Sequence, residues 1–310
     1  MRTSTKLLGY AAGVAVLAAG AFAIGVAVEP RRPTAAAPMP EHTAMTAPEA
    51  PAVAPATEAL PGLATTANGY TLVPASPVIE TGSPHPFAFT ITGPDGRPVT
   101  AYDVEHDKRM HLIVVRRDGA GFQHIHPEMA ADGTWTVPLA APAAGSYRAF
   151  ADFTPTGGPS TTLGVDLSAA GTFTPVTPAP SRVSQVDGYA VELAGELVPG
   201  ATSPVTLTIS RDGKPVTDLQ PYLGAYGHLV ALRSGDLAYL HVHPAAAAGA
   251  GPEIRFGTAV PSAGTYRLYL DFRHGDVVRT AEFTVTTSGT APAGPQPAPQ
   301  PAHDPAEPGH

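Results

Sequence analysis

The sequence contains no cysteine among its 310 residues. This absence excludes disulfide bonds, thiolate zinc sites, iron–sulfur clusters, cysteine-ligated blue-copper centres, a cysteine nucleophile and a lipid-modified N-terminal cysteine. Any metal site in this chain must therefore be built from histidine, carboxylate or methionine side chains.

Charge is also scarce. Charged residues make up 14% of the chain, against roughly 25% in ordinary soluble domains. Eighteen Lys and Arg residues stand against 26 Asp and Glu, giving a formal net charge of −8 with no basic cluster. The chain is therefore a poor partner for nucleic acid. Proline (36) and glycine (32) are abundant, so long helices are not expected to dominate.

The N-terminus predicts export. Two basic residues precede an uncharged, mainly apolar run from Leu7 to Val28. A signal-peptide core has about 7 to 15 residues, whereas about 20 helical residues span a bilayer. We therefore expect residues 1–29 to form an uncleaved signal-anchor helix in the cell membrane, with the bulk of the chain extracytoplasmic. Cleavage near Ala21 to Ala23, which would secrete the protein, is the alternative.

Two segments have the composition of disordered chain. Residues 30–66 are mostly Ala, Pro, Thr and Glu in irregular order, and residues 287–310 have a similar Pro-rich character. Both are too poor in large apolar side chains to offset the entropy cost of ordering them. We expect the first to be a tether and the second a tail.

Between these segments the sequence repeats itself over roughly a hundred residues. We therefore expect two copies of one domain, at residues 67–175 and 187–286, with a linker at 176–186. The matching segments are Asn68–Tyr70 with Asp187–Tyr189, Asp95–Val99 with Asp212–Val216, Met110–Pro127 with Gly227–Pro244, and Pro142–Phe153 with Pro261–Phe272.

Each copy has the pattern of short β-strands separated by turns. About seven strands per hundred residues, rich in Val, Thr, Tyr and Phe, favour an all-β fold of two tandem immunoglobulin-like β-sandwich domains. The expected strands are 70–73, 87–92, 110–116, 122–126, 134–137, 146–153 and 161–167 in the first copy, and 189–193, 205–210, 228–233, 238–243, 254–258, 265–272 and 279–286 in the second.

One hairpin recurs in both copies and carries three histidines each time. Asp118-Gly119 and Gly235-Asp236 suit tight primed turns, which set the register of the hairpin. That register places the first histidine opposite the last, and a third histidine lies two residues earlier on the same face. The two expected triads are His111, His124 and His126 in the first repeat and His228, His241 and His243 in the second.

Three imidazoles on one face can bind a metal ion. Opposed residues have Cβ atoms about 4.5 to 5.5 Å apart, from which the rings can converge on one ion at about 2.0 Å. Neutral imidazoles suit Cu(II), Zn(II) or Ni(II), and the Irving–Williams order favours copper, with zinc next. The first triad is the better copper candidate because further ligands lie nearby in its sequence. These are Asp103, His106, Met110, Glu128 and Met129.

Two other interpretations stay open. Buried histidines often hydrogen-bond the backbone, and two copies of one ancestor would share them, as in a structural or adhesive module. A metal enzyme is the third hypothesis, because Gly235 and His241-x-His243 resemble the start of a cupin motif, and His124, His126 and Glu128 part of a two-His-one-carboxylate set. Neither pattern continues, and no phosphate loop, nucleophile elbow or zincin helix motif is present, so we do not expect an enzyme.

Two other residue types recur in both repeats. Tyr147 and Tyr266 each follow a glycine by two positions and are expected to pack in the core. Asp152 and Asp271 recur near strand ends, where we expect them to make turn hydrogen bonds.

Both repeats carry one pattern: a histidine, a strand, an H-x-H-P motif and a later strand that begins with P-x-x-G-x-Y. On this pattern the sequence resembles exported actinobacterial proteins with paired immunoglobulin-like domains. More loosely, the pattern is similar to periplasmic copper-handling β-sandwich proteins. The resemblance spans Asn68 to Thr286 and implies extracytoplasmic metal handling, buffering or delivery, by the same six histidines. Copper chaperones of this general shape pair methionine with histidine at other spacings, which leaves the identity of the ion open.

Overall fold

Short β-strands separated by turns make up the part of the chain that the structure describes. This computed structural model describes residues 60–240, 242–245 and 249–289. None of these residues forms a helix, and so none provides a helix able to cross a membrane. The predicted signal-anchor helix, most of the tether and most of the tail lie outside the described residues. Both repeats belong to one compact unit.

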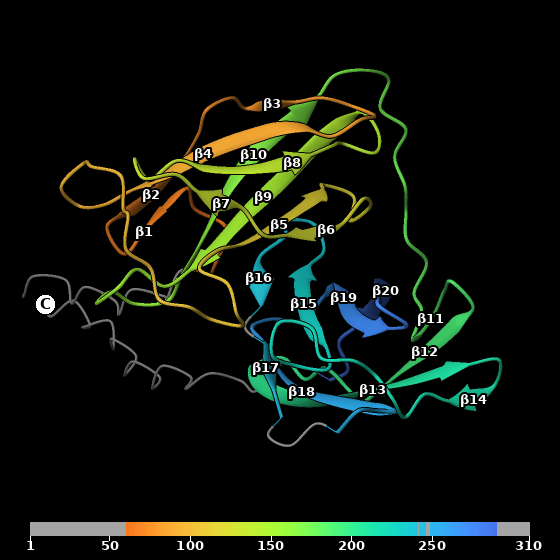
Figure 1. The fold of residues 1–310 in the computed structure, drawn as a ribbon. Helices are drawn as coiled ribbons and strands as arrows, with labels where there is room; N and C mark the ends of the chain where they lie inside the picture. Colours follow the sequence, from red (N-terminus) through yellow and green to blue (C-terminus); the bar gives the residue numbers. More distant parts are fainter. Residues whose placement is uncertain (1–59, 241, 246–248, 290–310) are drawn as a thin grey trace, which may run out of the picture. The chain divides into compact units, whose positions relative to one another are not determined.

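The first repeat is a sandwich of two five-stranded sheets, drawn from orange to green in Figure 1. Its strands are β1 (Thr66–Ala67), β2 (Tyr70–Pro74), β3 (Val78–Ile79), β4 (His85–Thr92), β5 (His111–Arg116), β6 (Gln123–Ile125), β7 (Glu128–Met129), β8 (Trp135–Leu139), β9 (Gly145–Phe153) and β10 (Thr161–Ala169). One sheet has the order β1-β2-β4-β8-β7 and the other β3-β10-β9-β5-β6.

The second repeat, drawn from green to blue in Figure 1, is built in the same way. Its strands are β11 (Val183–Val186), β12 (Tyr189–Ala194), β13 (Ala201–Arg211), β14 (Lys214–Pro215), β15 (His228–Arg233), β16 (Tyr239–Leu240), β17 (Val242–Pro244), β18 (Glu253–Val260), β19 (Thr265–His274) and β20 (Val277–Thr286). One sheet has the order β11-β12-β13-β18-β17, with β14 paired to β13, and the other β16-β15-β19-β20.

The strand order in each repeat is that of an immunoglobulin-like sandwich. Such sandwiches pair strands A, B, E and D in one sheet and C, F and G in the other. In the first repeat β2-β4-β8-β7 and β5-β9-β10 take these places, and in the second β12-β13-β18-β17 and β15-β19-β20 do so. The prediction of an all-β chain with two tandem immunoglobulin-like sandwiches is confirmed.

A buried tyrosine closes the same corner in both repeats. The Tyr147 hydroxyl at the start of β9 donates to the carbonyl of Ala143 at 2.6 Å, and the Tyr266 hydroxyl on β19 donates to that of Ser262 at 2.7 Å. Both residues are fully buried. This tyrosine corner is a hallmark of immunoglobulin-like domains, and it satisfies the phenol while the ring fills the core.

Besides one core in each sandwich, the chain has a third apolar cluster shared by the repeats. Every residue of β5 is buried, so this strand packs on both of its faces. The ring of Phe122 stacks on that of Tyr269 in the second repeat, with centroids 4.0 Å apart. The buried members of the shared cluster are Ile113, Val115, Phe150, Val230, Leu232, Leu237 and Tyr269. The β5–β6 hairpin therefore lies against the second repeat.

The two histidine hairpins differ in how far they extend. In the first, Leu112 lies opposite Ile125, which is the predicted register. In the second, Ala231 lies opposite Leu240 in the equivalent register, but Val242–Pro244 pairs with β18 in the other sheet. The expected pairing of His228 with His243 is therefore wrong. The strand changes sheets because Leu240 and Val242 both pack against the core of this repeat.

Candidate metal centre

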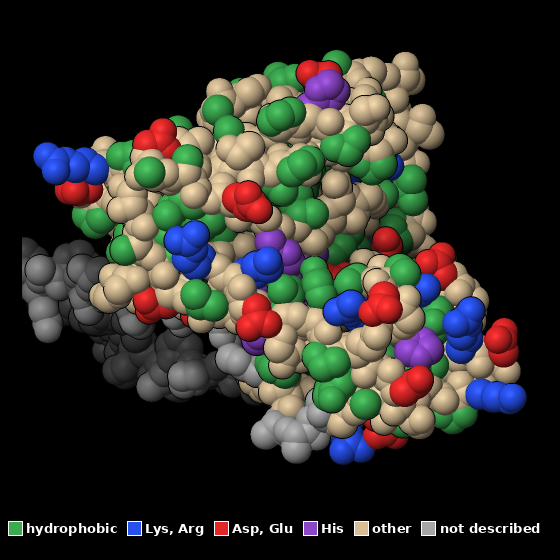
Figure 2. Space-filling view, in the orientation of Figure 1, with side chains coloured by type: hydrophobic (Ala, Val, Ile, Leu, Met, Phe, Trp, Pro, Cys, Tyr) green, Lys and Arg blue, Asp and Glu red, His purple; other side chains and the backbone are tan. Residues whose placement is uncertain are grey.

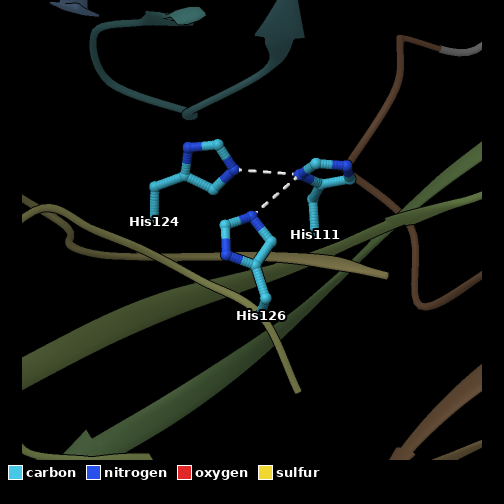
Figure 3. A group of neighbouring side chains, drawn as sticks. All are labelled: His111, His124 and His126. Atoms are coloured by element: carbon cyan, nitrogen blue, oxygen red, sulfur yellow. Dashed lines mark hydrogen bonds between the residues drawn. The ribbon is translucent and has the colours of Figure 1, made fainter. Parts of the chain in front are cut away.

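Three histidine side chains converge at the end of the β5–β6 hairpin. His111 begins β5, His124 lies on β6, and His126 follows β6 directly. Figure 3 shows nitrogens of the three rings pointing toward one another. His111 Nδ1 lies 3.1 Å from His124 Nε2 and 3.2 Å from His126 Nε2. One potential ligand atom from each of the three residues lies within 4.8 Å of the other two, so the group could hold one metal ion. Among the described residues, this is the group of three or more His, Asp or Glu side chains that meets this condition.

The spacing of these nitrogens suits a single bound ion. Two nitrogen ligands about 2.0 Å from a tetrahedral ion lie about 3.3 Å from each other. The separations of 3.1 and 3.2 Å are close to that value. The triad therefore requires little rearrangement to coordinate a metal.

Hydrogen bonds on the far side of two rings orient their free nitrogens. His111 Nε2 lies 3.1 Å from the carbonyl oxygen of Glu105, and His124 Nδ1 lies 2.8 Å from Asp271 Oδ2. Since a carbonyl and a carboxylate only accept, these nitrogens carry the protons. His111 Nδ1 and His124 Nε2 then direct lone pairs into the triad. Metal-binding histidines usually donate their second N–H to a carbonyl or carboxylate in this way.

The environment keeps two of the imidazoles neutral. Burial, followed by the neighbouring imidazoles, lowers the pKa of His111 from 6.5 to about 4, although its bond to Glu105 opposes the shift. Burial and the charges of His124 and His111 lower the pKa of His126 to about 3. A neutral imidazole has the lone pair that a metal needs. Both rings are therefore ready to act as ligands at pH 7.

Asp271, which orients His124, comes from the second repeat. Its side chain is buried, and Oδ1 accepts a hydrogen bond from Thr280 Oγ1 at 2.6 Å. It lies opposite His228 in the β15–β19 register, and Asp152 occupies the same place opposite His111. The expected turn role of Asp271 is therefore wrong. The signal in the sequence for this role is that an aspartate recurs at the same place in the strand that follows each P-x-x-G-x-Y motif.

The second predicted triad is not assembled by the described residues. His228 Nε2 donates to the carbonyl of Tyr222 at 2.7 Å, and its ring lies 6.3 Å from that of His124. His241 lies outside the described residues. The backbone of His243 lies opposite Gly257 on β18. The structure thus brings together the first three predicted ligands and places His228 beside them.

Of the five additional ligands expected for the first triad, His106 has its ring beside one of the triad rings. Its ring centroid is 6.1 Å from that of His111. Met110 is buried in the core of the first repeat, and Met129 packs against the same core. Asp103 accepts a hydrogen bond from Thr156 Oγ1 at 2.8 Å, and Glu128 is exposed.

A cavity of about 350 Å³ adjoins the triad between the two repeats. His111 and His124 form part of its wall, while Leu229, Leu240 and Phe256 form part of an apolar wall from the second repeat. Figure 2 shows histidine side chains reaching the surface near the middle of one face, beside basic and acidic side chains. The cavity beside the triad therefore has both polar and apolar lining residues.

Several solved structures are distantly similar to this chain. They include the adhesin FdeC of Escherichia coli (12% identity, TM-score 0.23, covering 72% of this chain and 65% of that one). Salmonella alpha-2-macroglobulin is another (14% identity, TM-score 0.24, covering 74% of this chain and 15% of that one). A third is a DUF4426 family protein from Pseudomonas aeruginosa (10% identity, TM-score 0.26, covering 34% of this chain and 96% of that one). Scores this low support no conclusion about function. No curated protein sequence matches the chain.

One family model matches each of the two repeats. Residues 65–171 match DUF8832, a domain of unknown function, and residues 184–289 match it again. The two matches together span more than half of the chain, which therefore belongs to the DUF8832 family as a tandem repeat.

Proposed function

We propose that this protein binds one divalent transition metal ion through His111 Nδ1, His124 Nε2 and His126 Nε2. The observation that carries the proposal is the convergence of these three ring nitrogens, with His111 Nδ1 lying 3.1 Å from His124 Nε2 and 3.2 Å from His126 Nε2. Its second support is the pair of outward N–H bonds, to Glu105 and Asp271, which aim two of those nitrogens inward.

The donor set favours copper, with zinc next. Three neutral imidazoles and no thiolate suit Cu(II) and Zn(II), and the Irving–Williams order places copper higher. Three protein ligands leave a further coordination position for water or for a ligand of another molecule. Such a position suits a protein that buffers or delivers its ion.

The cellular setting is part of the same proposal. The apolar run from Leu7 to Val28 and the tether that follows support a membrane-tethered extracytoplasmic protein. Such a protein would meet metal ions outside the cytoplasm. Cleavage of the N-terminal segment would release the same metal-binding repeats as a secreted protein.

Metal titration of the full chain, purified without a histidine tag, tests the proposal. We expect saturable uptake of Cu(II) or Zn(II) with one ion at the triad, and its loss in His126→Ala. The matched control is His85→Ala, because His85 is exposed on β4 and pairs with Glu80. Wild-type protein with no saturable uptake, or uptake undiminished in His126→Ala, would refute the assignment.

The second candidate function is a structural or adhesive module in which the histidines support the fold. The bond from His124 to Asp271 favours it, because it joins the repeats between side chains that are each 5% exposed. Removing one partner of a buried pair typically costs about 3 to 5 kcal/mol. This function predicts that His124→Ala lowers the free energy of unfolding by such an amount, and that no ion is bound.

A further inference from the structure

Two histidines outside the triad line the adjoining cavity. His106 and His228 form part of the same wall as His111 and His124. The acidic residues Glu105 and Asp152 are also among its lining residues, whereas no Lys or Arg is among those described. This charge pattern favours a cation over an anion.

His106 lies at the solvent side of this group. It is exposed, in a tight turn from Glu105 to Lys108 whose two backbone hydrogen bonds are 2.8 and 3.0 Å long. His106 has a φ of +48°, a conformation that asparagine and glycine adopt more readily. A histidine held there places an imidazole beside the cavity at some cost in backbone energy.

His228 repeats the hydrogen bonding of His111. Its Nε2 donates to the carbonyl of Tyr222, as His111 Nε2 donates to that of Glu105. In both histidines Nδ1 is thereby left as the nitrogen with a lone pair. His228 is half-buried and therefore lies deeper than His106.

The two rings are spaced like a pair of metal ligands. The ring centroids of His106 and His228 are 5.2 Å apart. Within the triad the centroid separations are 5.4, 4.9 and 4.9 Å. Each ring of this pair also lies near a ring of the triad. The centroid of His106 is 6.1 Å from that of His111, and the centroid of His228 is 6.3 Å from that of His124. The five imidazoles thus form a continuous group from solvent to the buried triad.

We propose that His106 and His228 form a second, two-histidine site that captures a divalent transition metal ion from solvent and passes it to the triad. This inference rests on the proposed function, since the triad is the destination of the ion. A two-ligand site holds an ion more weakly than a three-ligand site, so the ion moves on to His111, His124 and His126.

A capture site has a kinetic signature. Because the ion enters and leaves by the same route, removing the site slows uptake and release by the same factor. The dissociation constant at the triad then stays unchanged. A histidine that instead served as a fourth ligand of the triad would change the dissociation constant, mainly by accelerating release.

Stopped-flow measurement of Cu(II) uptake and release by the full chain tests the inference. His106→Asn removes the imidazole and keeps a residue that tolerates positive φ, and His85→Asn is the control at an exposed histidine on β4. We expect His106→Asn to slow both rates about tenfold or more with the dissociation constant unchanged within about twofold. His228→Gln, which can still donate to Tyr222, should behave in the same way.

The outcomes separate this inference from the function on which it rests. Wild-type protein that takes up no ion at equilibrium overturns both. Wild-type uptake with unchanged rates in His106→Asn, or with faster release and weaker binding, overturns the capture site alone. Slower rates in His85→Asn as well would overturn it too, because any exposed histidine would then have the same effect.

Discussion

His124 in the first repeat donates its Nδ1–H to Asp271 in the second, over 2.8 Å between Nδ1 and Oδ2. The carboxylate thereby fixes which nitrogen of His124 faces the triad. Each side chain is only 5% exposed, so water competes little for the bond. One predicted metal ligand is therefore oriented by a residue about 150 positions away in the sequence.

Asp271→Asn tests this orientation. The amide keeps the shape of the side chain but loses its charge, and losing such a partner of a ligand histidine typically weakens metal affinity about 10- to 100-fold. The measurement is the dissociation constant for Cu(II) in the full chain. Asp218→Asn is the matched control, because Asp218 also pairs with a histidine, His274, but is exposed and lies outside the cavity lining. Equal affinities in the two variants would remove Asp271 from the account.

Bound metal should stabilise the folded protein. An ion that binds only the native state at 100 times its dissociation constant adds about 2.7 kcal/mol to the free energy of unfolding. We expect this increase for wild-type protein in chemical denaturation with Cu(II) or Zn(II). In His126→Ala the increase should vanish. An equal increase in the variant would mean that the ion binds elsewhere.

The contact between the repeats at Gly119 should be sensitive to a single methyl group. Gly119 has a φ of +79°, and a Cβ there would lie 3.1 Å from Arg267 Nε of the second repeat. Gly235 also has positive φ, +99°, but a Cβ there meets nothing within 4 Å. Gly235→Ala should cost about 1 kcal/mol of unfolding free energy, and Gly119→Ala about 2 to 4 kcal/mol. Equal costs in denaturant titrations would show that the repeats do not pack closely at Gly119.

Alkaline pH should weaken the same contact. Burial raises the pKa of Tyr269 to about 12 from 10.0, and its hydroxyl donates to the carbonyl of Gly119 at 2.7 Å. Because the folded-state pKa is the higher one, this contribution is present below pH 10 and is lost as pH rises toward 12.

Tyr269→Phe isolates that contribution. Between pH 9 and pH 11.5, wild-type protein should lose about 2 kcal/mol more unfolding free energy than the variant. Other tyrosines ionise equally in both proteins, so the comparison cancels them. Identical pH dependence in the two proteins would show that Tyr269 titrates normally and is not held in the buried contact.

Local features of the sequence predict much of the fold. The repeat, the turn residues and the alternation of apolar positions predict the tandem sandwiches and the register of β5 with β6, since short-range pairing determines all of these. Local sequence features do not predict five short edge strands, because their few residues carry no clear pattern. These strands are β1, β3, β7, β11 and β14.

Contacts between the repeats were harder to predict. The unbroken apolar run of β5 signals burial on both faces, but it does not say what covers the outer face. The same limit applies to Asp271, whose partner His124 lies in the other repeat. The change of sheets after Leu240 also depends on core packing rather than on the turn that begins the hairpin.

X-ray absorption spectroscopy at the metal edge tests the central claim most directly. With one equivalent of Cu(II) or Zn(II) on the full chain, we expect three imidazole nitrogens at about 2.0 Å from the ion. The ion added to the His126→Ala control should lack this shell of three imidazoles. A spectrum with only oxygen ligands, or with the same imidazole count in the variant, would contradict a metal site formed by His111, His124 and His126.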